Sequence, residues 1–542
     1  MSSQSDRVAF DNSVQPYDET ILFKQKNWTY ITDSSSSGGV FNNQLQFDLN
    51  TLSSQSQWVD LSEAYVQFPV RVKIKNTGST SGSLTQSINA TVLKNGFHHF
   101  VDSVQVVLDG STVQASQIYE NISTTFKMMS EWSQDELRKY GPSLGIALDD
   151  YTNSSGVGID NIPIATLVKS TTGIDMSVAA NSGIAARQSQ QNIGVASGAV
   201  SSILSTQAKN VGKPQVAVVA GATVAAGSHS YTQFVLATIR LKDISPVLAA
   251  MPMSRNLKGF LYINYNSSTT TFSTAVTTGL PSAVSTAATA GRCCPMMVRS
   301  DLIAAAQYGD VATTWEVACE LSGVATELTT AIAPITYGRL VAPYFVANPQ
   351  VDAALSMKKT FRYLERNVST FDITAGASTT ITLSPGIANP KRVLLYPYFT
   401  GGITNLLSNP LLSPFDSSPA TTSPFAALKD LQILVANQPM FQNPVSMDWD
   451  QFSQEVAQQG LDGGLDSQSA SGLLSQQMWD RLYRFYTCDV GRRLESEDGS
   501  SKSVIVQCTN ATLANMRVIA MIYHEKEITV DTSMGRVYQG KA

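Results

Sequence analysis

The chain has 542 residues, enough for two or three domains that each bury a full core. Charged residues make up 15% of the sequence, below the usual share of about 25%, so much surface is small and polar or is buried against other subunits. The net charge is −5, and among the first twenty residues Arg7 is the only cation beside Asp6, Asp11, Asp18 and Glu19. This composition argues against a basic arm that binds nucleic acid directly.

The cysteines show no metal-binding or disulfide pattern. There are five, an odd number without zinc-like spacing, at Cys293, Cys294, Cys319, Cys488 and Cys508. A bond between the adjacent Cys293 and Cys294 would be strained, so we expect five reduced, partly buried thiols. The polar N-terminus has no signal-peptide pattern, and no run of about 18 apolar residues predicts a membrane span.

The first half is predicted to be rich in strands. In residues 64–75, Val66 and Phe68 begin a strict alternation of apolar and polar residues, the period of a half-buried strand. Asp109-Gly110 predicts a tight turn. Further strands are predicted over residues 45–49, 101–108 and 258–266.

A few short amphipathic helices are predicted between the strands. Ser133 and Glu136 form a capping box for a helix that stops near Gly141-Pro142. Apolar stripes with helical spacing are formed by Ile118, Ile122, Phe126 and Met129, by Trp449, Phe452 and Val456, and by Leu474, Met478, Leu482 and Phe485.

The second half repeats the strand-rich pattern. Strands are predicted over residues 380–383, 393–399, 431–435, 504–508 and 516–523, with a short final strand at 528–531. Residues 104–110 (VQVVLDG) resemble residues 431–437 (LQILVAN), and a helix beginning near an aromatic residue, Tyr119 or Trp449, follows each. Seven residues of loose similarity also arise by chance, but the shared order of strand, turn and helix favours two halves that are structural duplicates.

Four segments of the sequence resemble the double jelly-roll major capsid proteins of tailless icosahedral viruses, of the virophage and polinton-like type. They are VDSVQVVLDGSTVQ with QIYENISTTF (101–126), FVLATIRLKDISPVLAAMPMSRNLKGFLYINYN (234–266), NPKRVLLYPYF (389–399) and MRVIAMIYHEKEITVDTSMGRV (516–537). The third segment is similar to the strand that follows a long connection in the second jelly roll of these proteins. The resemblance implies an all-β chain of two jelly rolls, which assembles into homotrimers of pseudo-hexagonal outline.

The resemblance also implies a division of the chain. We expect an N-terminal arm at 1–20, a first jelly roll at 21–265, a Ser/Thr/Ala-rich linker at 266–295 and a second jelly roll at 296–542. The nearly uncharged stretch at about 152–230 is too long for a plain loop, and we interpret it as an insertion, either a β-rich tower or a subunit-contact loop.

No residues form a convincing catalytic, cofactor or metal site. His98-His99 precede a strand, where neighbouring side chains point to opposite faces and do not share a metal; a structural or interfacial role is expected. His229 belongs to no motif, and His524, at the edge of a strand, is expected to be a partnered surface residue. Nucleophile-elbow, HExxH and Walker patterns are absent.

Two groups of charged residues are candidates for binding sites. The acidic pairs and clusters at Asp149-Asp150 and at Glu495, Glu497 and Asp498 offer oxygen ligands for Ca²⁺, but solvated turns are the better interpretation. Arg492 and Arg493 are expected to pair between subunits rather than to bind nucleic acid.

The sequence therefore predicts a structural, non-enzymatic capsid protein of the virion, assembled inside the host cell. Its expected partners are its own copies in the trimer and lattice, together with penton and minor capsid proteins. The alternatives are a single jelly-roll capsid protein with a projection domain, or a β-rich adhesin or fibre module.

Overall fold

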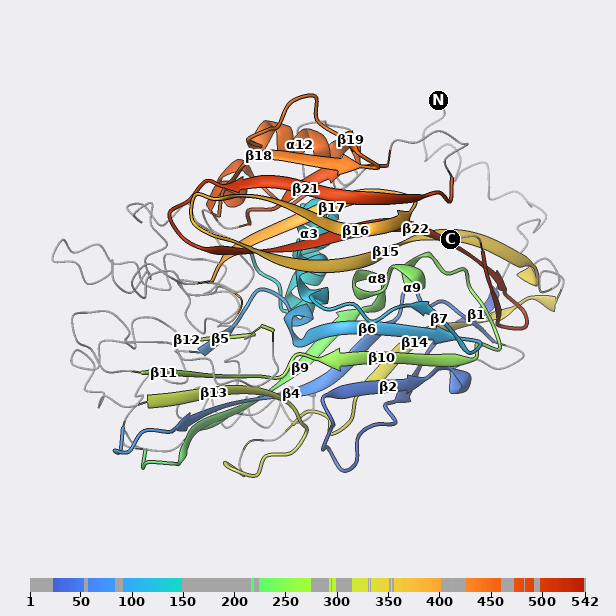
Figure 1. The fold of residues 1–542 in the computed structure, drawn as a ribbon. Helices are drawn as coiled ribbons and strands as arrows, with labels where there is room; N and C mark the ends of the chain where they lie inside the picture. Colours follow the sequence, from blue (N-terminus) through green and yellow to red (C-terminus); the bar gives the residue numbers. More distant parts are fainter. Residues whose placement is uncertain are drawn as a thin grey trace, which may run out of the picture.

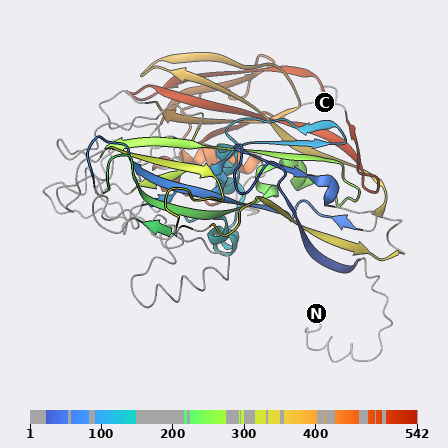
Figure 2. The same cartoon turned by 90° about the horizontal axis from the view of Figure 1, so that it is seen from below.

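The structure is a computed structural model. It describes residues 23–52, 57–82, 91–148, 216–218, 224–273, 292–293, 295–298, 314–329, 331, 333–349, 352, 355–400, 411, 426–459, 472–481, 483–491 and 498–540. Two β-sandwiches lie one above the other, and helix α3 (Glu120–Glu131) lies between them (Figure 1). Figure 2 shows the same arrangement from below.

The first sandwich consists of two antiparallel sheets, with the strand orders β2-β10-β6-β7 and β1-β14-β4-β9. The first sheet contains β2 (Gln44–Asp48), β6 (Val101–Leu108), β7 (Ser111–Gln114) and β10 (Gly259–Tyr265). The second contains β1 (Phe23–Thr32), β4 (Tyr65–Asn76), β9 (His229–Arg240) and β14 (Arg339–Ala347). The second sheet is extended by β3 (Trp58–Val59), β8 (Val216–Val218), β11 (Ser268–Ser273) and β13 (Thr314–Leu321), while β5 (Thr91–Leu93) pairs with β12 (Met296–Val298).

The second sandwich has the orders β16-β21-β18-β19 and β15-β22-β17-β20. Its first sheet contains β16 (Ser378–Ala388), β18 (Leu428–Val435), β19 (Gln438–Pro439) and β21 (Ser501–Asn510). Its other sheet contains β15 (Lys358–Ile373), β17 (Pro390–Phe399), β20 (Tyr486–Asp489) and β22 (Met516–Asp531), and β23 (Arg536–Gln539) pairs with the end of β22.

The two sandwiches repeat each other strand for strand. Numbered in chain order within each sandwich, the eight main strands occupy the same places in the two sheets, which is the pairing of an eight-stranded jelly roll. The hairpin β6-β7 corresponds to β18-β19. Both hairpins turn through two residues with positive φ, Asp109 (48°) and Gly110 (77°) in one, Ala436 (49°) and Asn437 (63°) in the other. The predicted duplication of the two halves is therefore confirmed.

The apolar alternation in the sequence explains the first core. In β4, Val66, Phe68, Val70, Val72 and Ile74 are all buried against the facing sheet, as predicted. A second cluster fills the other sandwich, and it includes Ile122 and Phe126 of α3. This helix follows β7 in the first sandwich but packs in the core of the second, so the two sandwiches share a hydrophobic element.

The helices are short, as the sequence indicated. In the described part of the chain they are α3, α4 (Gln134–Tyr140), α8 (Leu241–Ile244), α9 (Pro246–Ala250), α12 (Trp449–Gln458) and α13 (Gln476–Arg481), with 3₁₀ turns η1 (Leu49–Thr51), η2 (Phe97–Phe100) and η3 (Gly141–Leu144). The Ser133 side chain accepts a hydrogen bond from the Glu136 backbone, which confirms the predicted cap of α4. The stripe from Leu474 to Phe485 overstated α13, since its two ends lie outside the helix.

The strand pairing differs from the expected division of the chain. Ser268–Ser273, expected in the linker, form β11, and β13 and β14, expected in the second jelly roll, pair with β4 of the first. The reason is topological, because β14 lies between β1 and β4 and completes the first jelly roll. We propose that the division lies between Ala347 and Lys358. The expected arm at 1–20 and most of the expected insertion at 152–230 lie outside the described residues.

Two details of the second half also differ from expectation. Ile528–Asp531 are not a separate strand but the end of β22, and β23 is the final strand. β17 begins two residues after β16 ends, so no long connection precedes it.

Candidate functional site: the junction, the Arg392 cleft and the aromatic patch

His98 and His99 are buried structural residues. They lie in the 3₁₀ turn η2 and not in an extended segment, so the expectation of opposite faces is wrong; their rings are 4.3 Å apart. His98 Nε2 lies 2.9 Å from Thr125 Oγ1, and His99 Nδ1 lies 3.2 Å from Asn121 Nδ2, which attaches η2 to α3. Burial lowers the pKa of His98 to about 3, so its ring is neutral at ordinary pH.

The other two histidines lie in strands. His524 lies within β22 and not at its edge, 3.7 Å from the Glu365 carboxylate. Burial lowers the pKa of His524, and Glu365 opposes that shift. His229 begins β9, where burial likewise lowers its pKa.

The remaining candidate residues form no site in the described part of the chain. Asp498 is exposed in a turn, whereas Asp149, Asp150, Glu495, Glu497, Arg492 and Arg493 lie outside the described residues. The described cysteines, Cys293, Cys319, Cys488 and Cys508, are buried, and none is joined to another by a disulfide. Among the described residues, no three His, Cys, Asp or Glu side chains are grouped as metal ligands would be.

A group of polar contacts joins the two jelly rolls in a region that we call the junction: residues 113–120 of the first with Tyr363, Glu365 and Arg366 of β15. The Tyr363 hydroxyl donates to the Val113 carbonyl, and the Ala115 amide donates to Glu365 Oε1 at 3.0 Å. The contacts arise because β15 and β22 are 16 residues long and extend beyond their own sandwich (Figure 1).

A buried ion pair lies at the centre of the junction. Arg366 Nη2 lies 2.8 Å from Glu120 Oε2 and also donates to the Gln117 carbonyl at 2.8 Å; both charged side chains are 7% exposed. Burial raises the pKa of Glu120, and the nearby Arg366 charge acts against that shift. Each charge is tolerated in this position because the other is present, so the pair fixes how α3 sits on β15.

A second contact fastens the segment between β14 and β15. Asp352 accepts from Trp58 Nε1 at 2.9 Å and pairs with Arg255 at 3.0 Å, and the Arg255 guanidinium lies over the Trp58 ring at 5.1 Å. Beside it, the Arg255 amide donates to the Thr532 carbonyl at 2.8 Å. The connecting segment and the end of β22 are therefore both bonded to the first jelly roll.

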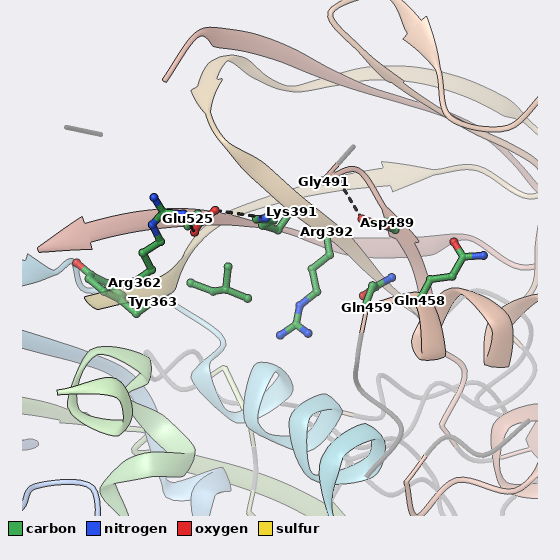
Figure 3. A pocket seen from close by; sticks show the side chains of 10 residues that line it. Arg362, Tyr363, Lys391, Arg392, Gln458, Gln459, Asp489, Gly491 and Glu525 are labelled. Carbon is green, nitrogen blue, oxygen red and sulfur yellow. Dashed lines mark hydrogen bonds and ion pairs between the residues drawn. The ribbon is translucent and has the colours of Figure 1, made fainter. Parts of the chain in front are cut away.

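A cleft of about 480 Å³ opens beside the junction, and we call it the Arg392 cleft (Figure 3). Its walls come from β15, β17, β22, the end of α12 and the residues around β20. The lining residues are Arg362, Tyr363, Leu364, Lys391, Arg392, Gln458, Gln459, Asp489, Gly491 and Glu525. Lys391 and Arg362 each lie 3.3 Å from Glu525, while the Arg392 side chain points into the space toward α3.

Exposed aromatic side chains form a patch on the second sheet of the first jelly roll. Trp28 and Tyr30 of β1 are 52% and 54% exposed, and the Trp28 ring lies 6.0 Å from that of Tyr65. Lys26 lies over the rings of Trp28 and Phe345. We call Trp28, Tyr30, Tyr65 and Phe345 the aromatic patch. Exposed groups of large apolar side chains are typical of protein interaction surfaces.

Solved structures share this architecture. A chain of the Sputnik virophage cryo-EM structure matches 100% of this chain over 93% of its own length, with a TM-score of 0.54 and 10% identity. The mavirus major capsid protein matches 100% of this chain over 95% of its own length, with a TM-score of 0.50 and 10% identity. The chain has the double jelly-roll fold. At 10% identity the likeness establishes the fold alone.

The comparisons of the sequence itself found no match. No family model matches the sequence, and no curated protein matches it. Within the described residues, no helix has the length and apolar character of a membrane span.

Sequence reasoning missed the residues that form these sites. Glu120 did not stand out because it lies at the start of an apolar helical stripe. Arg366 did not stand out because it lies in a strand that the sequence did not predict. Arg392 had a weak signal, since Lys391-Arg392 is a basic pair at the start of an apolar strand. Trp28 and Tyr30 alternate with polar residues, but that pattern does not say which face meets solvent.

Proposed function

We propose that this protein is a structural major capsid protein, whose homotrimers tile an icosahedral virion shell. The observation that carries the proposal is the strand-for-strand repetition of one jelly roll within one chain. Three such chains supply six similar units, which suits a six-fold position in a lattice. The likeness to the mavirus major capsid protein supports the same assignment.

The junction supports a rigid building block. A shell subunit must hold its two jelly rolls in one relative orientation, since neighbouring contacts depend on it. The Glu120–Arg366 pair and the Asp352 contacts are buried or half-buried bonds that fix this orientation. A helix shared with the second core has the same effect.

The aromatic patch supports association. Trp28 and Tyr30 expose large apolar surfaces in a single chain, and burying them against another subunit would be favourable. We propose that the patch contributes to contacts between copies, in the trimer or between trimers. Penton and minor capsid proteins are the further partners that such a shell requires, and the proposed role is structural rather than catalytic.

The alternatives fit the fold less well. A single jelly-roll protein with a projection domain does not account for a second unit with the same strand order. An adhesin or fibre module does not require two duplicated sandwiches joined by a buried ion pair.

Negative-stain images of the purified protein test the proposal. We expect particles with a hexagonal outline and three-fold symmetry at moderate concentration. Single elongated particles at all concentrations and salt conditions would contradict the trimer.

A further inference from the structure

Arg392 is a buried cation whose bonding is incomplete. Its residue is 8% exposed, and its guanidinium forms no ion pair or hydrogen bond with any described residue; its Nε is fully covered without a partner. The contacts that it does make are with rings, since the guanidinium carbon lies 4.4 Å from the Tyr523 ring centre and 5.8 Å from that of Phe126.

The other cations of the cleft differ from Arg392. Lys391 is paired with Glu525, and Arg362 with Glu525 and, at 2.9 Å, with Glu527. Arg366 of β15, which is equally buried on the other side of β22, has the Glu120 carboxylate. Arg392 is therefore the exception among the described cations that line this region, and Figure 3 shows its guanidinium in the open part of the cleft.

Burying the Arg392 guanidinium without an acceptor costs folding free energy. Arginine keeps its charge and has five N–H donors, and burying donors without acceptors costs free energy. The ring contacts offset part of this cost and hold the guanidinium plane in position. A planar guanidinium fixed in this way matches the two oxygens of an oxyanion.

We infer that the Arg392 cleft is a binding site for a carboxylate group. The lining holds three cations and two carboxylates, Asp489 and Glu525, so its net charge is +1. One singly charged carboxylate balances that charge, whereas a doubly charged phosphate exceeds it. The Arg392 fork would take both carboxylate oxygens. A free small carboxylate and an acidic side chain of a polypeptide present the same group to it.

A ligand in the Arg392 cleft would affect the junction between the two jelly rolls. The cavity on the α3 and α9 side of β15 is also lined by Arg392, Tyr363 and Leu364, so a ligand at Arg392 lies beside both jelly rolls. A bound carboxylate would neutralise the charge at this point and strengthen the junction, since a ligand that binds only the folded state stabilises it.

Thermal unfolding of the full chain with added ligand tests the inference. The probes are sodium acetate, inorganic phosphate at matched ionic strength, and a peptide of residues 1–20 beside its version with Asp6, Asp11, Asp18 and Glu19 changed to amides. The variants are Arg392→Gln, Arg392→Lys and, as a matched control, Arg517→Gln, which removes another arginine of the same sheet from its pair with Asp372.

We expect acetate to raise the unfolding temperature saturably in wild type and Arg517→Gln, more than phosphate does, and to bind about tenfold or more weakly to Arg392→Gln. Arg392→Lys keeps the charge without the fork, so it provides a folded test if the Gln variant does not fold; we expect weaker binding there too. Tighter, Arg392-dependent binding of the acidic peptide identifies a polypeptide as the source, and binding of acetate alone identifies a small carboxylate. An equal response of the Arg392 and Arg517 variants, a stronger effect of phosphate, or no saturable response at all would overturn the inference.

Discussion

The junction and the aromatic patch contain similar side chains, aromatic rings beside charged groups, in opposite surroundings. At the junction, Tyr363, Glu120 and Arg366 are buried and bonded within one chain. On the patch, Trp28 and Tyr30 face solvent, and the nearby Lys26–Glu63 pair is exposed. The comparison separates two tasks: the junction joins two jelly rolls in one chain, whereas the patch is the surface that we propose for contacts between copies.

The largest expected effect comes from breaking the junction. Arg366→Met leaves the Glu120 carboxylate buried without its cation, and we expect a loss of about 3–5 kcal/mol in the free energy of unfolding. Urea denaturation followed by fluorescence measures it. The control is Arg517→Met, whose partner Asp372 is largely exposed, and we expect about 0–1 kcal/mol there. Equal losses in the two variants would mean that the junction pair contributes no more than a surface pair.

Substitutions in the aromatic patch should weaken association and leave the stability of the chain almost unchanged. Trp28→Glu combined with Tyr30→Glu changes exposed side chains, so we expect a change in unfolding free energy within about 0.5 kcal/mol. Association should weaken strongly, because charges would have to be buried in the contact. Analytical ultracentrifugation measures the shift toward monomer. Leu513→Glu, at an 87% exposed apolar residue in another part of the fold, serves as control. Unchanged association in the double variant would remove the patch from the proposed interface.

The smallest change that we expect is in how the stability of the fold depends on pH. In another part of the same sheet, Arg71 and Lys73 of β4 pair with Glu320 and Glu327. Burial alone would raise the pKa of Glu320, but its hydrogen bonds with Lys73 and Arg71 and their charges lower it overall. Because the pKa of Glu320 is lower in the folded chain than in the unfolded chain, its charge stabilises the fold at pH values above the unfolded-state pKa. This contribution is lost as the pH falls through the folded-state pKa. We expect Glu320→Gln to flatten the fall in stability as pH decreases below the ordinary glutamate pKa of 4.5. An identical fall in wild type and variant would contradict this.

The parts of the fold that the sequence predicted are those with strong local patterns. β4 and β6 alternate apolar and polar residues against one core, and the Asp109-Gly110 turn supplies the positive φ angles that its hairpin needs. β15 was missed because charged residues interrupt its apolar alternation. Arg366 pairs with Glu120 across the junction and Arg362 pairs with Glu525 and Glu527 of β22, and no local pattern records either contact. The assignment of β14 to the first jelly roll depends on pairing with β1, about 300 residues earlier in the chain.

The candidate sites were harder to predict for the same reason. Glu120 and Arg366 are 246 positions apart in the sequence, and each looks like an ordinary charged residue until the fold brings them together. His98 and His99, for which the sequence predicted a structural or interfacial role, lie in a 3₁₀ turn, and His524 lies in a central strand rather than at a strand edge.

Two jelly rolls joined rigidly in one chain form the subunit that we propose assembles in threes. Multi-angle light scattering on a sizing column measures the native mass directly. We expect a species of three times 58.3 kDa. A clean monomer of 58.3 kDa in both low and high salt would contradict it.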